Sequence, residues 1–162
     1  MATPAAVKSS FITVDQYLAR EREADYKSEY FNGEIFAMAG ASEPHVLIVN
    51  SIIARLYVQL EHRSCKVYSN DMRLKVSTAG LYTYPDVMVV CGEVQFDDDE
   101  FDMLLNPILI VEVLSKSTES YDRTTKFEHY SKLKSLQEYL LSISAVLVSS
   151  SSPKKAKAVG RF

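Results

Sequence analysis

Two short apolar runs, each associated with one carboxylate, constrain the fold of this chain more than any other feature. The first run, 87–90, follows Pro85 and Asp86, and the second, 108–114, encloses Glu112 between valines, leucines and isoleucines. Short apolar runs rich in β-branched residues are typical of strands that are covered on both faces. Because proline has no backbone donor, Pro85 suits the first position of a strand. The sequence therefore predicts two buried strands that carry acids.

The remaining pattern predicts helices and strands in a mixed order. Thr13 and Gln16 have the spacing of a helix-capping box, and Asn32-Gly33 is typical of a two-residue hairpin turn. We expect helices at 13–22, 42–62 and 122–133, and strands at 26–31, 34–39, 65–76, 85–90, 107–114 and 136–143, with a loop at 77–82, an acidic surface connection at 93–106 and a polar turn at 115–120. This order predicts a single mixed α/β domain.

The last nineteen or so residues differ in composition from the rest. Residues 144–162 contain a serine run followed by a lysine- and alanine-rich stretch with weak periodicity. Such a composition offers little apolar surface to bury, so we expect a flexible or poorly packed tail. We therefore divide the chain into a domain at 11–143 and a tail at 144–162.

The two cysteines and the N-terminal residues bear on the cellular setting. Cys65 and Cys91 are too few for a disulfide framework and fit no zinc spacing, and Cys91 ends an apolar run where a buried thiol is common. Residues 1–10 lack the apolar segment of a signal peptide, and no apolar run approaches the length of a membrane span. We expect a reduced, cytoplasmic protein that is not associated with a membrane.

The charge balance and the missing motifs narrow the function classes. The net charge is −3, with acids concentrated at 93–102, whereas proteins that bind duplex DNA non-specifically are usually basic. A local basic face remains compatible with this balance. The sequence has no glycine-rich phosphate loop, no Gly-x-Ser-x-Gly elbow and no dinucleotide fingerprint, which excludes NTPase, serine hydrolase and Rossmann interpretations.

Asp86 and Glu112 are the strongest candidates for chemistry. An ionised carboxylate inside an apolar strand must pair, take up a proton or bind a cation. Magnesium takes one or two protein carboxylates and keeps several waters, so these two acids suit a magnesium site. The alternative is that Glu112 pairs with a lysine or arginine, or points into solvent from the end of its strand.

Other candidates are open to ordinary structural interpretations. Lys126 follows Asp122 by four residues, so a helix salt bridge explains both as well as a catalytic role does. His45 begins a predicted helix and Glu34 follows a predicted turn, so each either borders a cleft or is a capping or surface residue. His62 and His129 have no companion at metal-ligand spacing, and we expect both to face solvent.

The combined motifs resemble a known nuclease family. They comprise Pro85-Asp86, Glu112-Val113-Leu114-Ser115, Ser117-Thr118-Glu119, Tyr121-Asp122-Arg123 with Lys126-Phe127 and Tyr130, together with Asn32-Gly33-Glu34, His45, the strand 67–74 and residues 136–140. In this order they resemble the putative restriction endonuclease family expanded in cyanobacteria, within the PD-(D/E)XK nuclease superfamily. The likeness spans about 11–142.

The resemblance implies a restriction-endonuclease-like fold, with a central mixed sheet flanked by helices, and a set of site residues. Asp86 and Glu112, with Val113 contributing through its backbone, would bind Mg²⁺, with Mn²⁺ as an alternative. The superfamily lysine normally follows the glutamate by two residues, where this chain has Leu114, so Lys126 would take that role. Glu34 and His45 would be additional cleft residues.

Three functional interpretations follow. The first is a magnesium-dependent endonuclease acting on DNA, with homodimer formation at a sheet edge left uncovered by the unusual C-terminal segment. The second is a weak or inactive nuclease fold serving as an interaction or dimerisation module, which the acidic charge and the altered C-terminal segment favour. The third is an RNA or nucleotide phosphodiesterase on the same metal site.

Overall fold

The computed structural model of the chain describes residues 11–97, 99–115, 118–143, 146–151 and 156–159. Predictions for 1–10, for Ser117 and its neighbour at 116, and for parts of the tail lie outside these residues. The helical segments are α1 (Val14–Glu23), α2 (Glu43–Leu60), α3 (Glu119–Tyr121), the π-helical turn η1 (Asp122–Lys126) and α4 (Phe127–Tyr130). The strands are β1 (Ser28–Phe31), β2 (Glu34–Ala37), β3 (Cys65–Ser69), β4 (Arg73–Val76), β5 (Leu81–Thr83), β6 (Val87–Cys91), β7 (Met103–Leu104), β8 (Leu109–Val113), β9 (Glu138–Ile143), β10 (Val146–Ser151) and β11 (Ala156–Val159).

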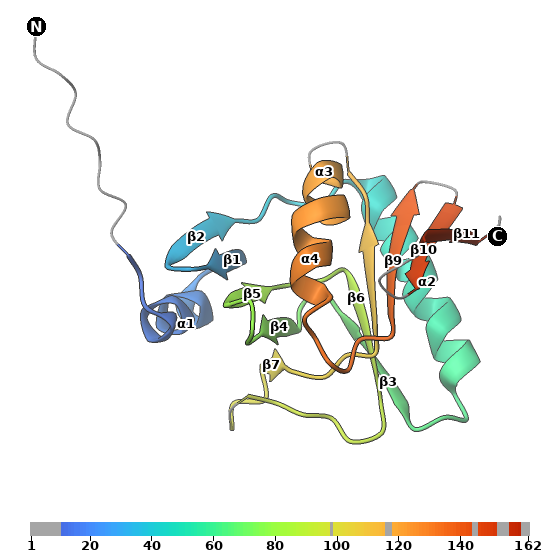
Figure 1. Cartoon of the computed structure of the whole chain (residues 1–162), viewed down its shortest axis with the longest axis horizontal. Coiled ribbons are helices and arrows are strands. Elements are labelled where there is room, and N and C mark those ends of the chain that lie inside the picture. The colour runs from blue at the N-terminus through green and yellow to red at the C-terminus, as the bar shows by residue number, and fades with distance from the viewer. Residues whose placement is uncertain (1–10, 98, 116–117, 144–145, 152–155, 160–162) are drawn as a thin grey trace, which may run out of the picture.

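The strands form two mixed sheets. The five-stranded sheet has the order β2-β1-β5-β4-β7, and the six-stranded sheet has the order β11-β10-β9-β8-β6-β3. In the larger sheet β6 runs antiparallel to β8, and β8 runs parallel to β9. Figure 1 shows α2 on one side of the larger sheet and the α3–α4 segment on the other, next to the smaller sheet. This is the mixed α/β arrangement that the sequence predicted.

Side-chain alternation along the central strands separates two cores. Val87, Val111 and Val113 pack with Val49 of α2, whereas Met88 and Ile110 pack in the core that contains Tyr130 and Tyr139. Successive residues of a strand point to opposite faces, so Glu112 lies on the same face as Ile110, away from α2. The strand 87–91 is buried on both faces, as predicted.

The first helix and the first hairpin form where the capping and turn residues predicted them. Thr13 and Gln16 form the predicted capping box at the start of α1. Asn32 and Gly33 join β1 to β2 with φ values of 48° and 91°, the left-handed conformation that this turn requires. Both predictions are confirmed, with strands shorter than expected.

Several predicted boundaries are wrong. The expected strand 65–76 is two strands, because a turn closed by the Met72 amide on the Ser69 carbonyl sends β3 into the larger sheet and β4 into the smaller. The expected loop 77–82 contains the start of β5. The acidic connection 93–106 does not stay at the surface, since Met103 and Leu104 of β7 are buried beside β4.

The C-terminal segment is more regular than its composition indicated. The expected tail contains β10, which pairs antiparallel with β9, and β11, which pairs with β10. These two strands contradict the expectation of a flexible tail, because backbone pairing does not depend on the hydrophobic periodicity that the tail lacks. That the tail is poorly packed stays a prediction. The domain boundary at residue 143 stays a prediction.

Cys65 and Cys91 form a disulfide between β3 and β6, where they are direct partners in the antiparallel register. The expectation of free thiols is therefore wrong. The sequence placed these residues 26 positions apart, and only the pairing of the strands brings them together. Among the described residues, no helix has both the length and the apolar character needed to cross a membrane.

Candidate functional site

Asp86 and Glu112 meet at one end of the larger sheet. Because β6 and β8 are antiparallel, with Val87 opposite Val111, the residue that precedes β6 lies beside the residues that end β8. The Val113 amide donates a 2.7 Å hydrogen bond to Asp86 Oδ2. Asp86 is 8% exposed and Glu112 is 4% exposed. The structure therefore brings the two predicted acids together in a largely dehydrated position.

Glu112 is surrounded by one cation and one hydroxyl donor. Its Oε1 atom lies 3.1 Å from Lys126 Nζ and accepts a 2.8 Å hydrogen bond from the Tyr130 hydroxyl. Burial raises the pKa of Glu112 to about 8; Lys126 and Tyr130 lower this pKa, while the charges of Asp86 and Asp122 raise it. Without another cation, Glu112 therefore favours its protonated form near neutral pH.

Lys126 reaches this face from a π-helical turn. The expected helix 122–133 is shorter and irregular, with η1 inserted between α3 and α4. Such turns are uncommon and often occur at functional sites. Burial alone lowers the pKa of Lys126, but the carboxylates around its ammonium group outweigh that effect, so its pKa lies well above the ordinary value. Lys126 is therefore a buried, charged lysine beside Glu112.

Two further carboxylates contact the same ammonium group. Asp122 Oδ1 lies 3.3 Å from Lys126 Nζ, so the ordinary salt bridge within the helix exists alongside the contact with Glu112. Glu29 Oε1 of β1 lies 3.4 Å from Lys126 Nζ. Sequence reasoning missed Glu29 as a site residue. Its one local signal is a charge inside a predicted strand, three residues before the Asn32-Gly33 turn.

His45 contacts Asp86 from the first turn of α2. Its Nε2 atom lies 2.9 Å from Asp86 Oδ1, and the His45 side chain is partly buried. The two oxygens of Asp86 therefore face different partners, the imidazole of His45 and the amide of Val113. His45 therefore contacts one of the two predicted acids, and its role as an additional cleft residue stays a prediction.

Glu34 and Val113, the two remaining predicted site residues, differ from the others in their contacts with the acids and Lys126. Glu34 is exposed at the start of β2, and among the described residues its side chain makes no hydrogen bond or ion pair with Asp86, Glu112 or Lys126. Val113 contacts Asp86 through its amide, and its role as a metal ligand stays a prediction.

His129 contradicts the expectation of a solvent-facing side chain. It is buried against the ring of Phe31, and its Nδ1 atom has no hydrogen-bond partner within the described part of the chain. Burial lowers its pKa, as does the nearby charge of Lys132. The position is buried because α4 packs against β1, a contact between elements distant in sequence.

The charges around Lys126 are unbalanced. In the part of the chain that the structure describes, Glu29, Asp86, Glu112 and Asp122 are all buried, whereas Lys126 is the one buried lysine. Asp122 Oδ1 is buried without a hydrogen-bond partner of good geometry among the described residues. Buried negative charge in excess favours uptake of protons or cations, so these donors fit a hard divalent cation. Within the described ranges, no group of three or more His, Cys, Asp or Glu side chains is arranged to hold a metal ion.

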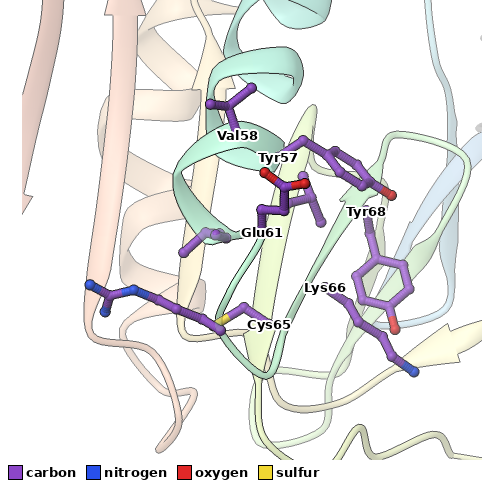
Figure 2. Close-up of a pocket in the computed structure, with 9 residues that line it drawn as sticks. Tyr57, Val58, Glu61, Cys65, Lys66 and Tyr68 are labelled. Atoms are coloured by element: carbon purple, nitrogen blue, oxygen red, sulfur yellow. The ribbon is translucent and has the colours of Figure 1, made fainter.

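A pocket of about 590 Å³ lies elsewhere, between the C-terminal half of α2 and β3. Tyr57, Glu61, Lys66 and Tyr68 line it in Figure 2, beside Cys65. Cys65 pairs with Cys91 at the end of β6, whereas Asp86 precedes the start of that strand. The pocket is therefore separate from the acids and contains none of them.

A family model and two curated relatives match most of the chain. The model of the Uma2 family, described as "putative restriction endonuclease", matches residues 14–148. The uncharacterised protein sll1609 of Synechocystis sp. strain PCC 6803 is 39% identical over 133 residues, covering 82% of this chain and 75% of that protein. A second Synechocystis protein, slr1290, is 36% identical over 130 residues, covering 80% of this chain and 67% of that protein.

A solved structure supports the fold. The crystal structure of a "putative nuclease belonging to DUF820" from Anabaena variabilis superposes with a TM-score of 0.73 and 18% sequence identity, covering 91% of this chain and 83% of that one. The expected restriction-endonuclease-like architecture is thereby confirmed. From the match to residues 14–148 and the two Synechocystis relatives, this chain is a member of the Uma2 family of putative restriction endonucleases.

Proposed function

We propose that this protein is a magnesium-dependent endonuclease that hydrolyses DNA phosphodiester bonds at the Asp86–Glu112–Lys126 cluster. The observation that carries the proposal is the 3.1 Å contact between Lys126 and Glu112, on the strand whose Val113 amide binds Asp86. Two acids and a lysine on one face are the groups that phosphodiester hydrolysis needs. The family description and the nuclease title of the Anabaena neighbour support the same reaction class.

In this proposal Asp86 and Glu112 hold Mg²⁺, or Mn²⁺ as an alternative, with water completing the coordination. The bound ion would polarise the phosphate and make a water molecule more acidic. The charge of the ion would also compensate the excess of carboxylates around Lys126. Without the ion, the proton that Glu112 retains near neutral pH reduces this excess.

The protein groups would then divide the remaining work. The Lys126 ammonium, in contact with Glu112, would orient the attacking water and stabilise the negative charge that develops on the phosphate oxygens. His45 would fix the orientation of the Asp86 carboxylate through its 2.9 Å contact. It also lies where it could exchange a proton with the reacting groups.

The test is cleavage of supercoiled plasmid DNA by the purified protein with millimolar Mg²⁺ and with EDTA. Wild-type protein should nick the plasmid only with the metal, and Asp86→Asn, Glu112→Gln and Lys126→Met should each lower the rate by about 10²-fold or more. Lys132→Met is the matched control, since Lys132 is exposed and lies on the same segment.

Metal-dependent cleavage that persists in all three site variants would overturn the proposal. A wild-type protein that binds Mg²⁺ but cleaves neither duplex DNA, single-stranded DNA nor RNA would favour the alternative of an inactive nuclease-fold interaction module. Cleavage of RNA alone would retain the metal site and change the substrate to RNA.

A further inference from the structure

Glu29 links Lys126 to the smaller sheet. Glu29 lies in β1, next to β5 in the five-stranded sheet, whereas Glu112 lies in β8 of the six-stranded sheet. Lys126 Nζ lies 3.4 Å from the Glu29 carboxylate and 3.1 Å from the Glu112 carboxylate. The ammonium group therefore bridges the two sheets.

The Glu29 carboxylate is itself held from two sides. The Thr83 hydroxyl of β5 donates to Glu29 Oε1, the oxygen that faces Lys126. The Tyr121 hydroxyl of α3 donates to Glu29 Oε2 over 3.3 Å. Burial and the nearby charge of Glu29 raise the pKa of Tyr121 to about 12, so the phenol remains a donor. Both oxygens of Glu29 thus have fixed protein partners.

We propose that Glu29 is a positioning residue, whose carboxylate holds the Lys126 ammonium against Glu112 in the geometry that cleavage requires. This inference rests on the proposed nuclease function. Lysine has a flexible four-carbon side chain, so its ammonium needs contacts from outside its own helix to have one position. Asp122 cannot provide such a contact, because it lies one turn away on the same segment and moves with Lys126.

The contact with Lys126 distinguishes Glu29 from a purely structural carboxylate. As a purely structural carboxylate it would resemble Glu21, which is equally buried at 8% exposure and bonds Ser28 and Tyr84, but Glu21 makes no contact with Lys126. A role as a direct metal ligand would instead raise the Mg²⁺ requirement of Glu29→Gln strongly, which the test below measures.

The test compares Glu29→Gln with Glu21→Gln, its matched control. Single-turnover cleavage by Glu29→Gln should be about 10- to 100-fold slower, since a small displacement of a catalytic group has effects of this size. The Mg²⁺ concentration at half-maximal rate should stay within about twofold of wild type. Tyr121→Phe, which removes one support of Glu29, should give a smaller decrease, and Glu21→Gln should keep the wild-type rate.

A double-mutant cycle tests whether Glu29→Gln lowers the cleavage rate through Lys126. If Glu29 acts through Lys126, adding Glu29→Gln to Lys126→Met should lower the rate by less than about twofold further. A wild-type rate in Glu29→Gln, a full additional decrease in the double variant, or a large rise in the Mg²⁺ requirement would each overturn the positioning role. The proposed nuclease function would survive each of these results, because all three are measured on protein that cleaves DNA.

A measurement that does not need activity separates the two proposals. In protein labelled with ¹³C at lysine Cε, the Lys126 methylene should have a high order parameter in wild type and in Glu21→Gln. Its order parameter should fall in Glu29→Gln. If the wild-type protein cleaves no nucleic acid, the proposed function fails, and a Lys126 methylene that stays ordered in Glu29→Gln overturns the positioning role on its own.

Discussion

The Tyr130 hydroxyl and the Lys126 ammonium bind the same oxygen of Glu112, at 2.8 Å and 3.1 Å. The two donors are four residues apart, on either side of the junction between η1 and α4. One short helical segment therefore presents two side chains to one buried carboxylate. This arrangement explains how an acid inside an apolar strand is accommodated in the fold.

Replacing Tyr130 with phenylalanine should destabilise the protein by about 1 to 3 kcal/mol, because a buried carboxylate loses a hydrogen bond. Urea denaturation in metal-free buffer measures the change. Tyr139→Phe is the control, since its hydroxyl donates to the backbone carbonyl of Asp122, a neutral acceptor, and should cost about 1 kcal/mol. Equal stability of Tyr130→Phe and wild type would show that the hydroxyl does not stabilise Glu112.

The stability of the metal-free protein should fall between pH 6.5 and pH 8. The pKa of Glu112 is raised from 4.5 to about 8, so between these values the folded protein holds a proton that the unfolded chain releases. The free energy of unfolding therefore decreases as pH rises, by roughly 2 kcal/mol between pH 6.5 and pH 8. Urea denaturation at several pH values measures it.

Two other groups with shifted pKa values affect stability below this pH window. His129 has a lowered pKa, so its neutral folded form gains stability as pH rises toward 6.5, which opposes the effect of Glu112 below that value. The pKa of Asp102 is lowered by its hydrogen bond to Arg22, and its contribution is lost only below pH 3.8. Glu112→Gln should remove the decrease above pH 6.5, and an unchanged decrease in that variant would assign it to another group.

Magnesium should stabilise the wild-type protein and have little effect on Glu112→Gln. A ligand that binds only the folded state at 100 times its dissociation constant adds about 2.7 kcal/mol. Without metal, Glu112→Gln should be at least as stable as wild type, because burial already favours the uncharged form of Glu112 and glutamine is uncharged at every pH. Thermal denaturation with and without Mg²⁺ tests both points, and equal stabilisation of both proteins would place the metal elsewhere.

Reduction of the Cys65–Cys91 disulfide should lower the free energy of unfolding by about 3 to 4 kcal/mol, as expected for a loop closed over 26 residues. Urea denaturation with and without dithiothreitol measures the loss. The double variant Cys65→Ala/Cys91→Ala should show no response to the reductant. A wild-type protein equally stable in both conditions would mean that the bond does not form in solution.

The sequence by itself determined the local elements that carry the site. The capping box at Thr13, the Asn32-Gly33 turn and the two acid-bearing strands were all predictable, because each depends on neighbouring residues and on strand or helix periodicity. Local signals indicated Asp86 and Glu112 as candidate site residues, and the family motifs added Lys126.

The tertiary structure alone decided which partners these residues have. Glu29 and Thr83 are 54 residues apart, and Lys126 comes from a third element, so no local pattern could assemble them. The same holds for the disulfide between β3 and β6 and for buried His129, which packs against Phe31. Strand pairing and the packing of one sheet against a helix join residues that are distant in sequence, and local periodicity carries no information about that choice.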